Sequence, residues 1–206
     1  MSAKVSDAKS ESQVEYKARG AKKSIVREWI EAIFIALILA LVIRTFVVQA
    51  FKIPSGSMLE TLQIGDHILV NKFIYRFRDI KRGDIIVFKY PKDETRDFIK
   101  RAIGLPGDKI EIKQRVVYVN GRPIDEPYSI HDSSNEYSTP RDNFGPIQVP
   151  KNKLLVLGDN RENSADSRFW GFLDIGKVKG KAFIIYWSWD HDNFGVRWNR
   201  LGMLLH

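Results

Sequence analysis

The sequence predicts a mainly β protein, with a domain of coiled sheet that follows one apolar helix. Three observations predict this fold class. A long apolar run stands near the N-terminus, short β-rich runs broken by Gly and Pro follow it, and no comparable helical period comes later. The chain has 206 residues, 44% of them apolar and 28% charged, which is ordinary globular composition with enough length for a core.

Composition excludes several classes of protein. The chain has no cysteine, so disulfide scaffolds, zinc ribbons, iron–sulfur clusters and cysteine nucleophiles are ruled out. Its 33 Lys and Arg against 25 Asp and Glu give a net charge of +8. A basic balance suits nucleic acid or an anionic membrane surface, and composition alone does not choose between them.

The first expected element is a helix that ends at Phe51. Residues 30–51 are almost wholly apolar, and 22 residues make a helix of roughly 33 Å, about the thickness of a hydrocarbon core. Arg44 can reach the headgroups from near one end, and Trp29 suits the interfacial belt at the other. We therefore expect a transmembrane anchor over residues 29–51.

Two other interpretations of this run remain. A run that is apolar on every face disfavours a buried core helix. A cleavable signal peptide is the closer rival, because the run has the length of its apolar region and residues 48–50 include small side chains. The long preceding segment of mixed charge favours the anchor.

The flanking charge predicts the orientation. Residues 1–28 hold seven basic residues against four acidic ones, and five of the seven lie between Lys17 and Arg27. The positive-inside rule then predicts a cytoplasmic tail over residues 1–28 and an extracytoplasmic domain over residues 52–206.

Seven β-rich runs follow the apolar segment, each bounded by Gly or Pro signals. They are residues 67–70, 84–90, 97–103, 109–112, 115–119, 153–157 and 181–189. Asn120-Gly121 is the strongest hairpin signal in the chain. Residues 129–146 are polar and contain proline, which predicts a mobile loop or part of an inserted subdomain.

The segment after the apolar run is the first candidate for chemistry. Pro54 and Gly56 impose a tight path from which Ser57 projects, with the Ser55 hydroxyl and backbone N–H groups beside it. Acyl transfer needs such a nucleophile near donors for the developing oxyanion. Taken alone, this segment is better explained as an ordinary juxtamembrane turn.

Lys100 is the second candidate. Strand alternation places it on one face with Phe98 and Ala102, and an ammonium on an apolar face loses its proton more easily. A charge that protects an edge strand from aggregation is the commoner use of such a lysine.

Residues 158–171 form the third candidate, a turn dense in carboxylates, arginines and small hydroxyls. A solvated charged loop is the plain alternative. The segment differs from a calcium loop because Arg161, Ala165 and Trp170 replace oxygen ligands. None of the four histidines, His67, His131, His191 and His206, stands in an informative motif, so a Ser-His-Asp triad has no support.

Taken together, these segments closely resemble the type I (bacterial) signal peptidases, membrane-anchored serine proteases with a Ser/Lys dyad. The match runs in order through the apolar segment and then residues 54–62, 65–73, 82–88, 99–108 and 158–171. The sequence departs from the usual pattern at Glu60, where Pro is usual, at Arg76, where Gly is frequent, and at Glu162, where Asp is common. These departures put the local backbone shape in doubt more than the activity.

The resemblance implies roles for eleven residues. Ser57 is implied as the nucleophile and Lys100 as the general base, and Ser55 with the Ser57 N–H as the oxyanion donors. Supporting roles fall to three further residues: Ser164, which orients the lysine, and an ion pair between Asp166 and Arg168. The implied lining of shallow pockets for small substrate side chains is Ile53, Met58, Leu62, Phe98 and Ile99.

The resemblance also implies the fold and the activity. The expected fold is mainly β: a retained transmembrane helix, then a coiled antiparallel β-sheet catalytic domain with a smaller inserted β subdomain over about residues 105–150. The expected activity is removal of signal peptides from exported preproteins after small residues, at the outer face of the bacterial cytoplasmic membrane, by a single-pass protein. The expected partners are signal peptides and the lipid bilayer, with the secretion machinery nearby. No metal, cofactor or nucleic acid is expected.

Two rivals remain open. One is a membrane-anchored β domain that binds partners without catalysis, which the pairing of Ser57 with Lys100 in family motifs disfavours. The other is a Ser/Lys regulator that cleaves itself, which the anchor disfavours.

Overall fold

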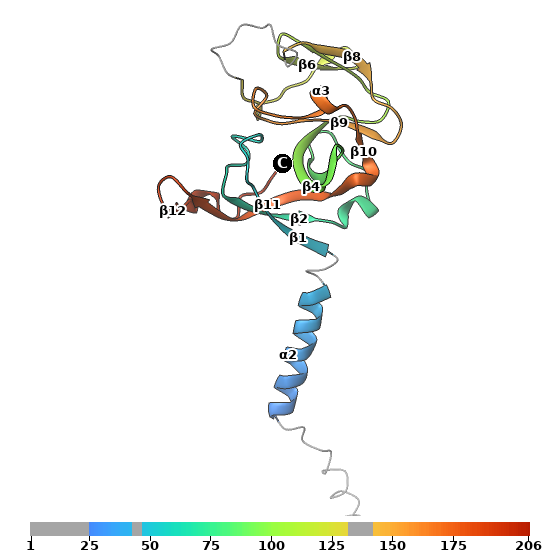
Figure 1. Ribbon diagram of the computed structural model, residues 1–206. Helices are drawn as coiled ribbons and strands as arrows, with labels where there is room; N and C mark the ends of the chain where they lie inside the picture. The colour runs from blue at the N-terminus through green and yellow to red at the C-terminus, as the bar shows by residue number, and fades with distance from the viewer. Residues whose placement is uncertain (1–24, 43–46, 132–141) are drawn as a thin grey trace, which may run out of the picture. The chain divides into compact units, whose positions relative to one another are not determined.

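The computed structural model describes residues 25–42, 47–131 and 142–206 (Figure 1). The chain divides into two units, residues 1–43 and residues 44–206. The predicted cytoplasmic tail lies almost wholly outside the described residues, as do residues 132–141 of the polar loop.

The first unit contributes helix α2, Ile25–Val42. Its apolar side chains are exposed, with Ile30 at 62% and Leu39 at 57%, and Arg27 pairs with Glu31 one turn later at 3.1 Å. Among the described residues, no helix combines the length and the apolar character that a membrane crossing requires.

The expected helix runs too far towards the C-terminus, because α2 ends at Val42 and strand β1 spans Val48–Lys52. β-Branched and aromatic residues such as Val48 and Phe51 favour extended backbone. An antiparallel partner is also available, since Val48 pairs with Asn71 and Lys52 with His67. The ladder with β2 therefore decides the conformation of a segment that hydropathy alone assigns to the helix.

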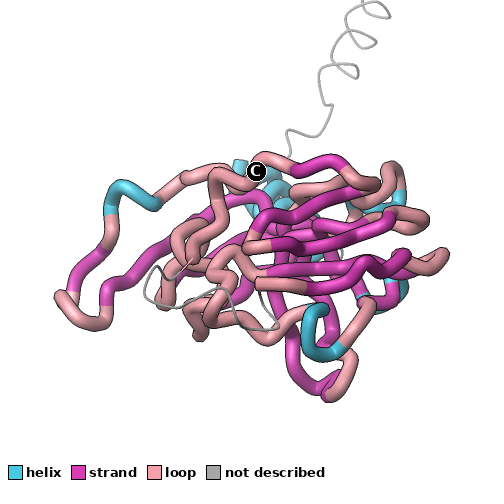
Figure 2. The backbone as a smooth tube through the Cα atoms, turned by 90° about the horizontal axis from the view of Figure 1, so that it is seen from above, coloured by secondary structure: helices cyan, strands magenta, loops and turns pink. Residues whose placement is uncertain are grey.

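The main sheet is antiparallel and has eight strands in the order β1-β2-β11-β3-β4-β9-β10, with β12 paired to β11. After β1, its strands are β2 Asp66–Asn71, β3 Ile85–Tyr90, β4 Asp93–Gly104, β9 Lys153–Leu157, β10 Leu173–Asp174, β11 Val178–Asp190 and β12 Gly195–Val196. Figure 2 shows several strands of the β unit running side by side. The long strands β4 and β11 each pair with several neighbours and so join the sheet along its width.

A second antiparallel sheet lies in sequence between β4 and β9, in the order β7-β6-β5-β8. Its strands are β5 Lys109–Lys113, β6 Val116–Val119, β7 Arg122–Pro123 and β8 Phe144–Gln148. Asn120 and Gly121, with φ of 53° and 80°, form the turn from β6 to β7, so the predicted hairpin is confirmed.

Short helices complete the described residues: η2 Ile74–Arg76, α3 Ser167–Trp170, η3 Ile175–Lys177 and η4 Trp198–Arg200. Each of the seven predicted β-rich runs coincides with a strand, and the mainly β prediction is confirmed. The sequence does not predict five strands. β1 falls within the expected helix, and β7, β8, β10 and β12 are short or carry Gly and Pro.

The core follows strand alternation. On β4, Ala102 packs in a cluster with Ile86 and Phe88, whereas the next residue, Ile103, packs in another with Ile110. This second cluster joins the two sheets, because it also contains Leu155 and Leu157 of β9. The second sheet therefore lies next to β9 and α3, as Figure 1 shows at the top of the molecule.

Candidate active site

The candidate nucleophile lies in a turn between two buried residues. Ile53 closes a backbone pair with the segment after the turn, since its N–H donates to Asp66 O at 2.8 Å and its carbonyl accepts from Gly65 N–H at 3.0 Å. Met58 is fully buried and its carbonyl accepts from Leu62 N–H at 2.7 Å. Ser57 is half-buried and lies in the short path between these two fixed points.

Lys100 reaches Ser57 from the neighbouring part of the sheet. It lies on β4 opposite Ile86 of β3, and only 3% of it is exposed. Its Nζ lies 2.7 Å from Ser57 Oγ and 2.9 Å from the carbonyl oxygen of Ile99. The Phe98 ring lies beside the amine, with 5.4 Å between Nζ and the ring centroid. Two residues 43 positions apart in sequence thus share one hydrogen bond.

Burial lowers the pKa of Lys100 from 10.5 to about 8. The charges of Asp166 and Asp159 oppose this shift but do not cancel it. Among the described residues, no carboxylate forms an ion pair with this amine. The ammonium form therefore lacks an ion-pair partner to stabilise it, which favours the neutral amine. A neutral Nζ can accept a proton from Ser57.

The two side chains open into a cleft of about 490 Å³. Its lining is Pro54, Ser55, Ser57, Arg96, Asp97, Phe98, Ile99, Lys100, Asn163 and Ala165. None of the four histidines is among these residues. The candidate nucleophile, the candidate base and an apolar wall therefore share one cavity, and the described lining offers lysine in place of imidazole.

The segment from Gly158 packs directly against the nucleophile turn. A Cβ on Gly158 would lie 2.5 Å from Ser57 O and 2.2 Å from Ser164 Oγ, so only glycine permits this approach. Asn160 donates twice to the turn, from its backbone N–H to Ser57 O at 3.2 Å and from Nδ2 to Gly56 O at 3.1 Å.

Asp166 and Arg168 form a buried bidentate ion pair, with Nη2–Oδ2 at 2.8 Å and Nε–Oδ1 at 2.9 Å. Burial by itself would raise the Asp166 pKa, but the hydrogen bonds and charge of Arg168 hold it below its usual range. Asp166 also accepts from Gly158 N–H at 3.1 Å, so the pair fixes the start of the loop.

Ser164 and three of the implied pocket residues are buried and are not among the residues that line the cleft. The Ser164 hydroxyl is buried without a hydrogen bond to Lys100, whose amine is held by Ser57 and the Ile99 carbonyl among the described residues. Phe98 and Ile99 line the cleft. The remaining three residues belong to the core. Ile53, Met58 and Leu62 bury their apolar side chains in a cluster with Ile68 and Val70.

A buried ion pair that the motifs do not predict lies next to the Ser57–Lys100 pair. Arg101, which follows Lys100, donates to both carboxylate oxygens of Asp159, at 2.9 and 2.7 Å. Thr61 Oγ1 donates to the same carboxylate at 2.6 Å. This cluster ties together β4, the nucleophile turn and the Gly158 segment. Arg101, Asp159 and Thr61 each lie within one of the matched motifs, but the sequence does not show that their side chains interact.

The segment that follows β7 supports the same loop. Arg161 forms a bidentate pair with Glu126 at 2.9 and 2.6 Å and donates to Gly158 O at 3.1 Å. Ile130 adds two backbone hydrogen bonds. Its N–H donates to Asp159 O, and its carbonyl accepts from Arg161 N–H. The inserted residues therefore brace the loop that contacts Ser57.

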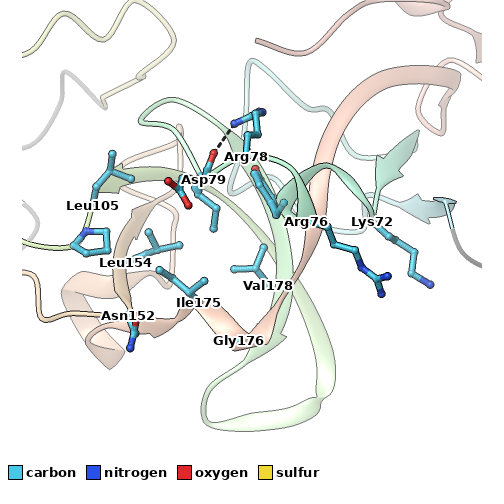
Figure 3. A pocket seen from close by; sticks show the side chains of 13 residues that line it. Lys72, Arg76, Arg78, Asp79, Leu105, Asn152, Leu154, Ile175, Gly176 and Val178 are labelled. Atoms are coloured by element: carbon cyan, nitrogen blue, oxygen red, sulfur yellow. Dashed lines mark hydrogen bonds between the residues drawn. The ribbon is translucent and has the colours of Figure 1, made fainter.

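Neither a metal site nor the other large cavity changes this assignment. No cluster of His, Asp and Glu suited to a metal ion occurs among the described residues. A cavity of about 740 Å³ has an apolar wall that includes Leu105, Leu154 and Val178 and a basic rim at Lys72 and Arg76 (Figure 3). None of the eleven predicted site residues lines it.

The chain matches a known protein family over most of its length. The model of the family described as signal peptidase, peptidase S26, matches residues 26–187. The chain belongs to this family. The resemblance inferred from the motifs is therefore confirmed, and the chain is a serine endopeptidase of the signal peptidase family.

The relatives carry consistent names. A probable signal peptidase I-2 of Synechocystis sp. is 48% identical over 158 residues, which cover 74% of this chain and 69% of the relative. A signal peptidase I of Leptolyngbya laminosa is 42% identical over 172 residues, covering 80% of this chain and 81% of the relative. A solved signal peptidase I of Enterococcus faecalis V583 shares 31% identity with a TM-score of 0.44, covering 50% of this chain and 97% of that one.

Proposed function

We propose that this signal peptidase family member cleaves signal peptides from exported preproteins through an acyl-enzyme on Ser57, with Lys100 as general base. The observation that carries the proposal is the 2.7 Å contact between Lys100 Nζ and Ser57 Oγ in a buried site. The pKa supports the same role as the contact, because burial lowers the Lys100 pKa to about 8 and so makes the neutral amine accessible near that pH.

The reaction proceeds in two halves. Neutral Nζ accepts the Ser57 proton as Oγ attacks the scissile carbonyl, and the resulting ammonium protonates the leaving amine when the C–N bond breaks. Water then enters, gives its proton to Nζ, and attacks the acyl carbon, and Ser57 regains a proton from the ammonium when the ester breaks. Lys100 thus cycles between two protonation states without a cofactor.

The developing oxyanion needs donors on the other side of the carbonyl carbon. The Ser57 N–H and the Ser55 hydroxyl are the proposed donors, and Ser55 lines the same cleft as the dyad. Removal of one such donor typically costs about 10²–10³ in kcat.

The proposed substrate binds as an extended strand beside residues 97–100 and 51–55. Residues 97–100, Pro54 and Ser55 line the cleft. Phe98 and Ile99 supply an apolar wall. We expect Ala, Gly or Ser immediately before the scissile bond, with a small residue two positions earlier. Efficient cleavage of matched peptides with Leu or Phe before the bond would contradict this assignment.

We further propose that the apolar N-terminal segment holds the enzyme at the cytoplasmic membrane, with its N-terminus in the cytoplasm and the β unit outside. The exposed apolar side chains of α2 and the basic residues before it support this topology. Protease added to intact spheroplasts should digest residues 52–206. Digestion that requires lysis would reverse the orientation.

The decisive experiment is cleavage of a model preprotein by the full chain in detergent or lipid. Wild type should release the signal peptide, whereas Ser57→Ala and Lys100→Met should not, although both stay folded by circular dichroism. Cleavage by both variants at the wild-type rate would overturn the mechanism. Absence of cleavage by wild type would favour the rival function, partner binding without catalysis.

A further inference from the structure

The side chain of Asn160 holds the peptide unit that precedes the nucleophile. Its Nδ2 donates to Gly56 O at 3.1 Å, while its own backbone N–H donates to Ser57 O at 3.2 Å. Gly56 O also accepts from Leu59 N–H at 3.2 Å, inside the same turn. The carbonyls on both sides of the Ser57 N–H are therefore held by one residue from the Gly158 segment.

The orientation of Gly56 O fixes the orientation of the Ser57 N–H. Both groups belong to one planar peptide unit, and in a trans peptide they point in opposite directions. Rotation of that plane would carry the N–H away from the carbonyl oxygen of a bound substrate. A second donor on Gly56 O, placed outside the turn, restrains this rotation.

Asn160 is itself well supported. Both of its chain neighbours form backbone hydrogen bonds with Ile130. The Asp159 carbonyl accepts from Ile130 N–H, and Arg161 N–H donates to Ile130 O. Asn160 O accepts from Asn163 N–H at 3.2 Å. The amide therefore projects from a fixed backbone, which a restraint on another segment requires.

We propose that Asn160 is a positioning residue for the oxyanion hole: it holds the Gly56–Ser57 peptide so that the Ser57 N–H faces the developing oxyanion. This inference rests on the proposed Ser57/Lys100 mechanism and deepens it. Asn160 acts through the peptide and takes no part in proton transfer. Its loss should lower the rate of the chemical step while leaving the binding of uncleaved peptide in place.

The test replaces Asn160 in the full chain with Ala, which removes the amide, and with Asp, which keeps the shape but removes the donor. Asn199, an exposed residue of η4, supplies the matched controls Asn199→Ala and Asn199→Asp. For each protein we would measure kcat, KM, the pH profile, the thermal midpoint and the inhibition constant of a peptide boronic acid. A boronate bonded to Ser57 Oγ places a negative oxygen in the oxyanion hole.

We expect kcat to fall about 10- to 100-fold in both Asn160 variants, with KM changed less than about twofold. Boronate affinity should fall by the same factor as kcat/KM. The apparent pKa of the kcat profile should stay at its wild-type value in Asn160→Ala. The Asn199 variants should match wild type in every readout.

Three results would overturn the inference: wild-type kcat in Asn160→Ala, a loss confined to KM or thermal stability, or a loss explained by a shifted pH profile. A merely structural role would weaken uncleaved peptide and boronate alike. Ser57→Ala and Lys100→Met separate this inference from the mechanism below it. If they abolish cleavage while Asn160→Ala keeps full kcat, only the positioning role fails, whereas activity in both refutes the mechanism.

Discussion

Lys100 shows how much chemistry depends on the surroundings of one side chain. An exposed lysine is almost wholly charged at neutral pH, so it cannot accept a proton from serine. Burial on β4 lowers its pKa to about 8, and its hydrogen bonds to Ser57 Oγ and Ile99 O orient the amine. In the part of the chain that the structure describes, no carboxylate forms an ion pair with it. Exclusion of water from Lys100 thus makes the neutral amine, the form that can act as the proposed base, accessible near pH 8.

The pH profile follows from this pKa. Since the neutral amine is the active form, kcat should rise about tenfold per pH unit below pH 8 and level off above it. Lys100→Arg keeps the charge but cannot deprotonate, so it should be folded and at least about 10³-fold slower. Peptide cleavage rates between pH 5.5 and 10 test both statements. A flat profile, or turnover by Lys100→Arg, would contradict them.

The same burial predicts a dependence of stability on pH. The folded pKa of about 8 lies below the ordinary 10.5, so between these values the unfolded state binds more protons. The free energy of unfolding of wild type should therefore rise with pH across this window by about 3 kcal/mol relative to Lys100→Met. Below pH 8 the full cost of burying the charge remains, and the difference becomes constant. Urea titrations of both proteins from pH 7 to 10.5 measure it, and parallel curves would refute it.

At the scale of elements, the site is a junction between β4 and two loops. Because successive side chains of a strand point to opposite faces, Lys100 contacts Ser57 and Arg101 pairs with Asp159. One strand thus supplies both the proposed base and a structural ion pair. The Gly158 segment closes the junction because a glycine allows its backbone to touch the nucleophile turn.

Gly158→Ala should therefore damage activity. The new Cβ would lie 2.5 Å from Ser57 O, a backbone atom that cannot move without displacing the nucleophile. We expect kcat to fall at least about 100-fold. Gly195→Ala is the matched control, since its Cβ meets only Asn193 O at 3.7 Å. Equal activity of the two variants would show that the approach is not required.

How far the sequence predicts these elements depends on what each signal measures. The β-rich runs predict all the strands of six or more residues, β2, β3, β4 and β11, because alternation and β-branched content report directly on half-buried extended backbone. Hydropathy misplaces the end of α2, because it cannot detect that β1 has a partner in β2. Motifs point to Ser57 and Lys100, but they cannot assign Arg101 to Asp159 or Asn160 to Gly56 O, because such pairs exist only after distant segments meet.

At the scale of the whole molecule, the inserted sheet is part of the support of the site. It shares a core cluster with β9, and the residues that follow β7 reach the catalytic loop through the Glu126–Arg161 pair. The side chains of that pair are 6% and 2% exposed, so the interaction is nearly free of screening by solvent.

Glu126→Gln should accordingly leave the buried Arg161 charge unpaired. We expect the free energy of unfolding to fall by about 3–5 kcal/mol, and kcat to fall because the Gly158 segment loses a brace. Glu94→Gln breaks the exposed Lys177–Glu94 pair and should change neither quantity. Chemical denaturation and peptide cleavage measure the two effects. Unchanged stability in Glu126→Gln would show that the insertion is not coupled to the loop.

The low proton affinity of Lys100 also makes it selectively reactive towards electrophiles. At pH 8 about half of its amines are neutral, against about one in three hundred for a lysine with the ordinary value of 10.5. A small aldehyde or activated ester shaped for the cleft would meet a nucleophilic amine and a nucleophilic hydroxyl 2.7 Å apart. Reagents that bridge nitrogen and oxygen should therefore label this one lysine in preference to those on the surface.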